Sequence, residues 1–390
     1  MIRLFLPLCL LLLGAAPGGS DGVVRLAIDS EQRWVPFDLT PGNQIRFRLT
    51  LDGRLLTGIL DTGVSYSVLA RASPAADPAR VLSGGSATAI GGAVAVGWLP
   101  TDRLAFGGLV RSGGGASVAA LPAIATGSAQ PVDMLIGRDV LAGTALDIDY
   151  ANKRFRLLRS GRMPFTGASA PLAISPGRHV YESALAIDGR VLAPMVVDTG
   201  DGSAITLSAL AWRRAAVAGV ATTSAISFGL AGPIVSGLAI VPHVSLGDGD
   251  AHDVEVRIEP QGGFSQAIGV AGRIGSGFLQ RYRVLLDPGA GRMVLSRNTA
   301  VDPPPLRSTS GLLLGLEQDR LRVLHVMRGG PAAAAGWAAG ETICAIDGQP
   351  VAADYATSPM AAWSVGAPGT RVALTLCDGT RRGLTLAHFY

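Results

Sequence analysis

Short apolar runs separated by glycines and polar turns recur along most of the chain. Val, Ile and Thr are frequent in or beside these runs, two of which are Phe47 to Leu51 and Ala184 to Ile187. Short runs of this kind, bounded by turn residues, are typical of strands, whereas a long helix needs a longer apolar stripe. The pattern therefore predicts a mainly β protein with many short strands.

The first residues follow a different pattern. The positively charged start Met1-Ile2-Arg3 precedes an almost unbroken apolar run from Leu4 to Leu13, and the small residues Gly14-Ala15-Ala16 come next. This order is typical of a signal peptide, which we place at residues 1–20, and it predicts a periplasmic or secreted protein. The run is shorter than the about 20 residues that span a bilayer, so we expect no stable membrane span after leader cleavage; an uncleaved N-terminal anchor is the alternative.

One long segment is repeated within the chain. Ile59 to Gly63 and Val196 to Gly200 each consist of an apolar strand end followed by Asp-Thr-Gly, and a predicted β-hairpin precedes each copy. Leu135-Ile136-Gly137 and Arg273-Ile274-Gly275 follow at nearly the same distance from each aspartate. Several anchors that stay in register over about a hundred residues indicate a duplication. The sequence therefore predicts two homologous β lobes, residues 23–160 and 172–298.

A third region follows consecutive prolines. The segment Val301 to Pro305 forces an extended backbone and predicts a semi-rigid spacer. Beyond it we expect a strand from Leu321 to Val326, a short helix from Pro331 to Gly336, and a tight turn at Ile346-Asp347-Gly348. These elements predict a separate domain over residues 306–390.

Composition and charge narrow the possible functions. Hydrophobic residues make up 48% of the 390 residues and charged residues 16%, so the chain is too apolar to be largely disordered. Lys+Arg 33 and Asp+Glu 29 nearly balance, and no basic run stands out, so nucleic-acid binding is not expected. Leader cleavage leaves Cys344 and Cys377, which form either a disulfide or two buried free thiols.

The paired Asp-Thr-Gly triplets carry the candidate chemistry. If the lobes pack about a two-fold axis, Asp61 and Asp198 meet at the interface, where two like charges share one proton. The ionised aspartate can then take a proton from water while the protonated one donates to a carbonyl oxygen, as amide hydrolysis requires. The remaining triplet residues are expected to support the pair by hydrogen bonds across the axis and by close backbone approach: Thr62, Thr199, Gly63 and Gly200.

The two triplets, each with a later Ile-Gly, resemble those of aspartic peptidases of the pepsin and retropepsin type. The resemblance implies two β-barrel-like lobes, one catalytic aspartate from each, a nucleophilic water, and an extended polypeptide substrate between the lobes. It also implies glycine-rich flaps over the substrate, for which ordinary hairpin loops are the alternative. The flap residues are expected to be Ile90, Gly91, Gly92, Phe228 and Gly229.

One residue departs from the family pattern. Asp201 directly follows the second triplet, where the family has a small residue and where the first triplet is followed by Val64. A third carboxylate at this place either raises the pKa of the dyad or points away into solvent.

Residues 306–390 are similar to a PDZ domain, an α+β fold. The resemblance rests on the Gly-Leu-Leu-Leu run and on the predicted helix and turn that follow it. It implies that a loop receives the C-terminal carboxylate of a peptide while the next strand pairs with the peptide backbone. The loop residues are expected to be Gly311, Leu312, Leu313 and Leu314. A PDZ domain used only for packing is the alternative.

Together these features predict an exported aspartic endopeptidase whose C-terminal domain binds peptide C-termini or unfolded segments. The alternative is a non-catalytic peptide-binding or scaffolding envelope protein with a degenerate dyad. No metal or other cofactor is expected, because the five His residues show no metal-ligand spacing and the sequence contains no phosphate-binding G-x-x-x-x-G-K loop.

Overall fold

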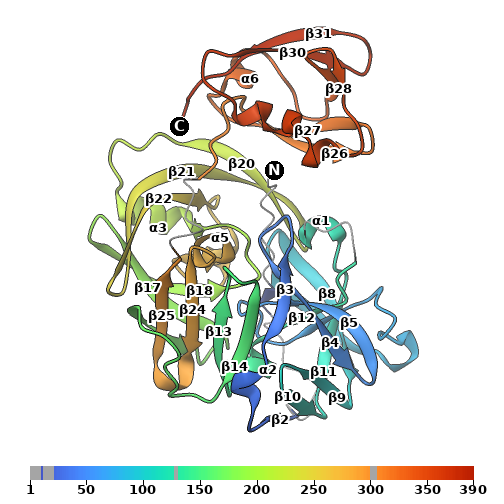
Figure 1. The fold of residues 1–390 in the computed structure, drawn as a ribbon, viewed down its shortest axis with the longest axis vertical. Coiled ribbons are helices and arrows are strands. Elements are labelled where there is room, and N and C mark those ends of the chain that lie inside the picture. Colours follow the sequence, from blue (N-terminus) through green and yellow to red (C-terminus); the bar gives the residue numbers. More distant parts are fainter. Residues whose placement is uncertain (1–9, 12–21, 127–130, 299–304) are drawn as a thin grey trace.

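The computed structural model describes residues 10–11, 22–126, 131–298 and 305–390. Most of the predicted signal peptide and of the proline spacer lies outside the described residues. The exceptions are Pro305 and the strand β1 (Leu10–Leu11). β1 pairs with β7 (Leu82–Ala89). Strands dominate and the helices are short (Figure 1), so the protein is mainly β, as predicted. None of the helices in the described ranges has the length and apolar character needed to cross a membrane.

Residues 23–160, called the first lobe below, contain the first copy of the repeated hairpin. In β4 (Ile45–Leu51) buried apolar residues alternate with two arginines and a threonine, which places one face of the strand on the core. Asp52 and Gly53 both have positive φ and turn the chain into β5 (Arg54–Leu60). The other elements of this lobe are β2 (Val23–Leu26), β3 (Val35–Leu39), β6 (Val68–Ala70), β7, β8 (Gly92–Pro100), β9 (Arg103–Phe106), β10 (Leu109–Ser112), β11 (Gly115–Ala119), α1 (Ala123–Thr126), β12 (Met134–Ile136), α2 (Arg138–Leu141), β13 (Ala145–Asp149) and β14 (Arg154–Leu158).

Residues 172–298, called the second lobe below, contain the second copy of this hairpin. Asp188 and Gly189, again with positive φ, join β17 (Tyr181–Ile187) to β18 (Arg190–Asp198). Both hairpins expected from the repeat are therefore confirmed. The other elements are β16 (Ala173–Ile174), β19 (Ile205–Leu207), α3 (Ala209–Ala215), β20 (Thr223–Gly229), β21 (Gly232–Leu246), β22 (Gly249–Ile258), α4 (Phe264–Ala267), β23 (Gly272–Gly275), α5 (Ser276–Leu279), β24 (Tyr282–Asp287) and β25 (Arg292–Arg297).

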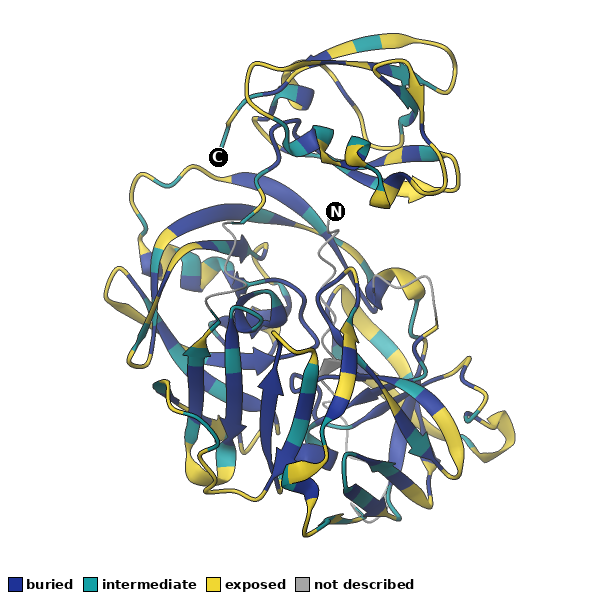
Figure 2. Ribbon diagram, viewed as in Figure 1, coloured by how far each residue is buried: buried dark blue, intermediate teal, exposed yellow. Residues whose placement is uncertain are grey.

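A sheet shared by both lobes joins them. β13 pairs with β14 on one side and with β24 of the second lobe on the other. β24 continues to β25, and β25 pairs with the linker strand β15 (Ala168–Pro171). These strands are mostly buried (Figure 2), and one apolar cluster contains residues of both lobes, including Phe155 and Leu286. Continuous pairing and a common core hold the lobes in one arrangement.

The third region has its own sheet and core. Its elements are β26 (Leu312–Glu317), β27 (Arg320–Val326), α6 (Pro331–Ala334), β28 (Thr342–Ile346), β29 (Gln349–Pro350), the short 3-10 helices Tyr355–Thr357 and Pro359–Val365, β30 (Arg371–Leu376) and β31 (Arg381–Thr385). The predicted strand, helix and turn are confirmed, the turn by positive φ at Asp347 and Gly348. Of the two alternatives for Cys344 and Cys377, the structure has the disulfide, with their Cα atoms 4.9 Å apart.

The structure differs from the predicted carboxylate-binding loop. Only Gly311 lies outside a strand, because Leu312, Leu313 and Leu314 belong to β26. Leu312 and Leu314 are buried in the core of the third region, so the alternation of a strand orders these residues. The expectation of a loop over all four residues was therefore wrong for three of them.

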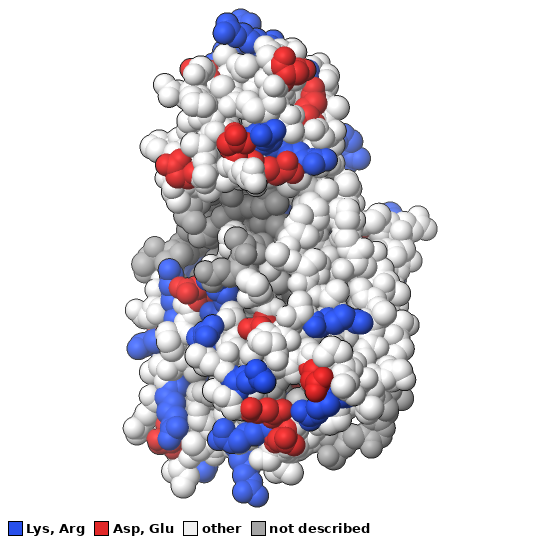
Figure 3. Space-filling view, turned by 90° about the vertical axis from the view of Figure 1, so that its right-hand side faces the viewer, with Lys and Arg blue, Asp and Glu red and all other residues white. Residues whose placement is uncertain are grey.

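The third region docks on β20 of the second lobe. Ser224 Oγ lies 2.8 Å from His325 Nε2 and accepts a hydrogen bond from the amide of Arg328. Thr223 Oγ1 donates to the Arg328 carbonyl oxygen at 2.7 Å, and Met327 packs with Ala225. In Figure 1 the hairpin β20–β21 lies directly below the third region. On the face shown in Figure 3, acidic and basic side chains are interspersed.

This docking contact is expected to weaken in acid. Burial lowers the pKa of His325 below its ordinary value of 6.5, although the contact with Ser224 opposes the shift. The docked state therefore favours neutral His325. The stabilisation of docking by neutral His325 is present above about pH 6.5, and it is lost as the pH falls through the lower pKa that His325 has in the docked state. The protection factors of the β20 amides, which compare the measured exchange with the intrinsic rate at each pH, should fall as the pH is lowered from 7 to 5. His325→Gln should remove this pH dependence, and equal dependence in that variant would refute the assignment.

Candidate functional site

Both Asp-Thr-Gly triplets begin where a buried strand ends. Asp61 follows β5, and its amide donates to the Ile136 carbonyl oxygen at the end of β12. Asp198 is the last residue of β18 and is the register partner of Gly275 at the end of β23. In both lobes the segment ending in Ile-Gly therefore lies beside the triplet, which explains why the repeat keeps that spacing.

The two threonines connect the triplets across the lobe interface. Thr62 Oγ1 donates to the Val197 carbonyl oxygen and Thr199 Oγ1 donates to the Leu60 carbonyl oxygen, both at 2.7 Å. Each hydroxyl also accepts a hydrogen bond from the amide of the other threonine at 3.1 Å. All four bonds are buried, and they occur in symmetric pairs. The structure thus brings the two triplets together, as the sequence predicted.

Loss of either threonine hydroxyl should destabilise the interface. Thr62→Val or Thr199→Val leaves one carbonyl and one amide of the opposite loop without a partner in a buried place. We expect each variant to lower the free energy of unfolding by about 2 kcal/mol or more in urea titrations. Thr62→Ser and Thr199→Ser keep the hydroxyl and should lose clearly less. Equal losses for Val and Ser would show that packing, not hydrogen bonding, matters here.

Each glycine of a triplet lies against the aspartate of the other. A Cβ atom added at Gly63 would overlap with the Asp198 carboxyl group, and one added at Gly200 would overlap with the Asp61 carboxyl group. Only glycine leaves room for this approach. The two carboxyl groups consequently face each other, and neither aspartate is exposed.

The environment of Asp61 favours a protonated carboxyl. Burial raises the pKa of Asp61 well above 3.8, and the neighbouring charge of Asp198 and hydrogen bonding with it raise it further. The amide of Gly63 opposes the shift, and the charge of Asp201 adds a smaller increase. Two adjacent buried carboxyl groups cannot both ionise at low cost, so the pair shares a proton over part of the pH range.

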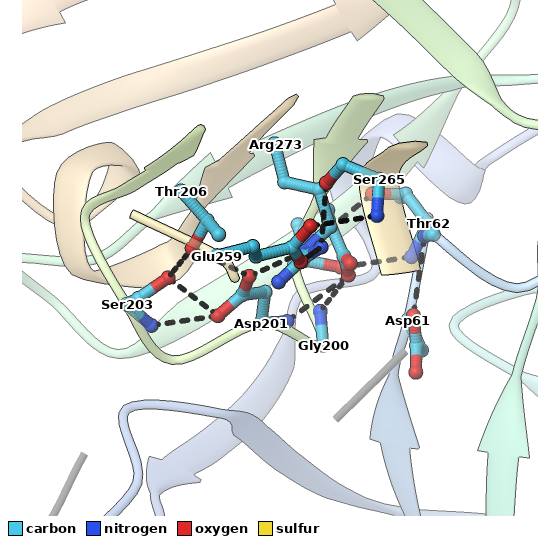
Figure 4. A network of polar contacts seen from close by, with 12 residues as sticks. Asp61, Thr62, Gly200, Asp201, Ser203, Thr206, Glu259, Ser265 and Arg273 are labelled. Atoms are coloured by element: carbon cyan, nitrogen blue, oxygen red, sulfur yellow. Dashed lines mark hydrogen bonds and ion pairs between the residues drawn. The ribbon is translucent and has the colours of Figure 1, made fainter. Parts of the chain in front are cut away.

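Asp201 does not point into solvent, and its carboxylate is paired with a cation. Its side chain is fully buried, with Oδ2 2.8 Å from Arg273 Nε and Oδ1 accepting from the amide and hydroxyl of Ser203 (Figure 4). Of the two alternatives for Asp201, pointing into solvent is therefore wrong, and the other, a raised pKa at the dyad, agrees with the small increase that its charge adds at Asp61. It makes a minor contribution to the pKa of Asp61, and a guanidinium faces its charge.

The expected flap residues lie at the tips of two hairpins that meet. Ile90 and Gly91 form the turn of the β7–β8 hairpin, and Gly92 begins β8. Phe228 and Gly229 end β20, just before the turn of the β20–β21 hairpin. The two turns touch, because the amide of Ala231 donates to the Ile90 carbonyl oxygen at 3.2 Å.

The hairpin tips pack against opposite lobes. Ile90, from the first lobe, shares an apolar cluster with Val196, which lies two residues before Asp198. Leu230, from the second lobe, shares a cluster with Ile59, which lies two residues before Asp61. Ile90 and Leu230 are buried, whereas Gly91 and Ala231 beside them are exposed. The two hairpins therefore cover the buried aspartates in this structure.

Sequence reasoning missed the side chains that connect each loop to the opposite lobe. Gln44 Nε2 donates to the Gly200 carbonyl oxygen at 3.0 Å, and Ser65 Oγ donates to the Arg178 carbonyl oxygen at 2.6 Å. Within the second lobe, Ser276 Oγ donates to the Thr199 carbonyl oxygen. For Gln44 the sequence offers one signal of such a contact, because this polar residue stands immediately before an apolar strand.

The described ranges contain no group of three or more His, Cys, Asp or Glu side chains placed to hold a metal ion. The candidate site consists of the two aspartates, their loops and the covering hairpins. No protein-family model matches this chain, and no curated protein matches it significantly.

Proposed function

We propose that the chain is an exported aspartic endopeptidase, resembling the pepsin and retropepsin type, in which Asp61 and Asp198 activate a water molecule. The observation that supports it most is the dyad: two buried carboxyl groups from crossing loops, each against the other's glycine. Structural carboxylates are usually paired with a cation or exposed, whereas a facing pair is an arrangement suited to moving protons.

The proposed reaction needs one proton on the dyad and one water between the carboxyl groups. The ionised aspartate takes a proton from the water as its oxygen bonds to the carbonyl carbon, and the protonated aspartate gives its proton to the carbonyl oxygen. A neutral diol results. The diol then collapses as the amide nitrogen takes a proton from the dyad, the C–N bond breaks, and the second diol proton returns to the dyad. Amine and acid leave, and the starting protonation is restored.

The third region is proposed to bind peptide C-termini or unfolded segments, as a PDZ domain does. β26 is the terminal strand of its sheet within residues 305–390, so it offers an edge for an added strand. The amides of Gly311 and Leu312 already donate to the hydroxyls of Ser308 and Ser310. A peptide carboxylate would compete with these hydroxyls, which predicts modest affinity.

Hydrolysis of an unfolded protein and a peptide library by the mature chain, between pH 4 and 7, tests this proposal. Cleavage that is lost on substitution of either dyad aspartate would support it. No cleavage at any pH, with peptide binding retained, would favour the alternative, a non-catalytic peptide-binding or scaffolding protein of the envelope.

A further inference from the structure

The two lobes differ at one pair of equivalent positions next to the dyad. In the first lobe Val64 and Leu135 occupy these positions and share an apolar cluster. In the second lobe the same positions are Asp201 and Arg273, which form a buried ion pair. The difference is chemical, since the backbone pairing of β12 with β5 and of β23 with β18 is parallel in both lobes.

The Arg273 guanidinium is held from a second side. Its Nη1 donates to Glu259 Oε1 at 2.6 Å and to Ser265 Oγ at 3.0 Å, and its plane lies near the Phe264 ring. Figure 4 shows this group of side chains beside the second triplet. A guanidinium fixed by two carboxylates and a hydroxyl gives the Asp201 side chain one allowed position.

The position of the Asp201 side chain fixes the direction of the Asp201 main-chain amide. Its amide donates to Asp198 Oδ1 at 3.0 Å, and the amide of Gly200 donates to the same oxygen at 3.0 Å. The Asp201 amide also donates to the main-chain oxygen of Asp198 at 3.2 Å. In the first lobe the amide of Gly63 donates to Asp61 Oδ1 at 3.1 Å, and the amide of Val64 donates to the main-chain oxygen of Asp61 at 3.4 Å. Asp198 therefore receives an amide bond that its counterpart lacks, and amide bonds favour the ionised carboxyl.

We infer that Asp201 and Arg273 are positioning residues that make the dyad unequal, so that Asp198 is the ionised base and Asp61 carries the shared proton. This inference rests on the proposed function for its consequence in catalysis, although the proton position stands by itself. The charged groups around the second loop are Asp201, Arg273 and Glu259. The hairpin tips add only the apolar Ile90 and Leu230.

Neutron diffraction from a crystal of the deuterated protein at about pH 5 tests the proton position without any assay of activity. The expected result is a deuteron on Asp61. A deuteron on Asp198 would overturn the inference, whether or not the protein hydrolyses peptides. A protein that shows the deuteron on Asp61 and cleaves nothing would contradict the proposed function alone.

A variant that copies the first lobe tests the role of the ion pair. Asp201→Val with Arg273→Leu reproduces Val64 and Leu135, and Glu259→Gln avoids an unpaired buried carboxylate. If the Asp201 amide loses its fixed position, the acid limb of the pH profile of kcat/KM should move up by about one pH unit. Val64→Ala with Leu135→Met is the matched control and should not move it. An unmoved limb in the folded triple variant would refute the positioning role.

Discussion

Asp61→Asn and Asp198→Asn should each abolish peptide hydrolysis while leaving the fold intact. An amide has nearly the shape of a carboxyl group but cannot exchange a proton with water at neutral pH, so it leaves the dyad without its acid or its base. Loss of one proton-transfer group costs about 10²- to 10⁴-fold in rate, and here each group serves in both halves of the reaction. We expect kcat/KM to fall below detection in both variants.

The surface variant Asp38→Asn is the matched control, because it makes the same chemical change in the first lobe at an exposed site, 4.0 Å from Arg46. It should keep the activity of the unmodified chain. Retained cleavage in either dyad variant would exclude the proposed mechanism, and binding of uncleaved peptide by both would show that peptide binding survives the substitution.

Asp61→Asn should also stabilise the folded protein, by an amount that depends on pH. The pKa of Asp61 is raised in the folded state, so the folded protein binds its proton more tightly than the unfolded chain does. Stability from this proton is fully present below about pH 3.8 and is lost as pH rises through the folded value. Asp61→Asn should therefore melt at higher temperature than the unmodified chain at pH 7. The difference should shrink as the pH is lowered toward 4, and a constant difference would contradict the raised pKa.

Much of the arrangement was accessible from the sequence because it rests on local signals that occur twice. The turns at Asp52-Gly53 and Asp188-Gly189 define the hairpins, and the duplication brings the two triplets into equivalent places. The duplication also explains why Thr62 and Thr199 could be predicted to bond across the axis. It places their two hydroxyls in equivalent positions, each facing the opposite loop.

The features that sequence reasoning missed depend on distant partners. Asp201 and Arg273 are 72 residues apart, so no local pattern could show that the carboxylate meets a guanidinium. The exchange of Ile90 and Leu230 between lobes likewise depends on how far each hairpin extends. Leu312 to Leu314 were misassigned for another reason: a run of apolar residues after a glycine fits a strand as well as a binding loop.

Alanine at Gly63 or Gly200 should damage the site severely. The added Cβ atom would occupy the place of the opposite carboxyl group, and that group is held by the amides of its own loop. The loops cannot separate without breaking the four threonine hydrogen bonds. We expect each variant to lose more than about 3 kcal/mol of unfolding free energy, at the upper end of overpacking costs.

Any Gly63→Ala or Gly200→Ala protein that does fold should hydrolyse peptides at least about 10²-fold more slowly, because a shift of about 1 Å in a reacting group has that effect. Gly143→Ala is the control: no atom lies within 4 Å of its added Cβ, and its backbone carries no positive φ. Urea titration and kcat/KM of the three variants separate the two effects. If Gly200→Ala matched Gly143→Ala in both, the carboxyl groups would not face each other as described, and a shared proton between Asp61 and Asp198 would lose its physical basis.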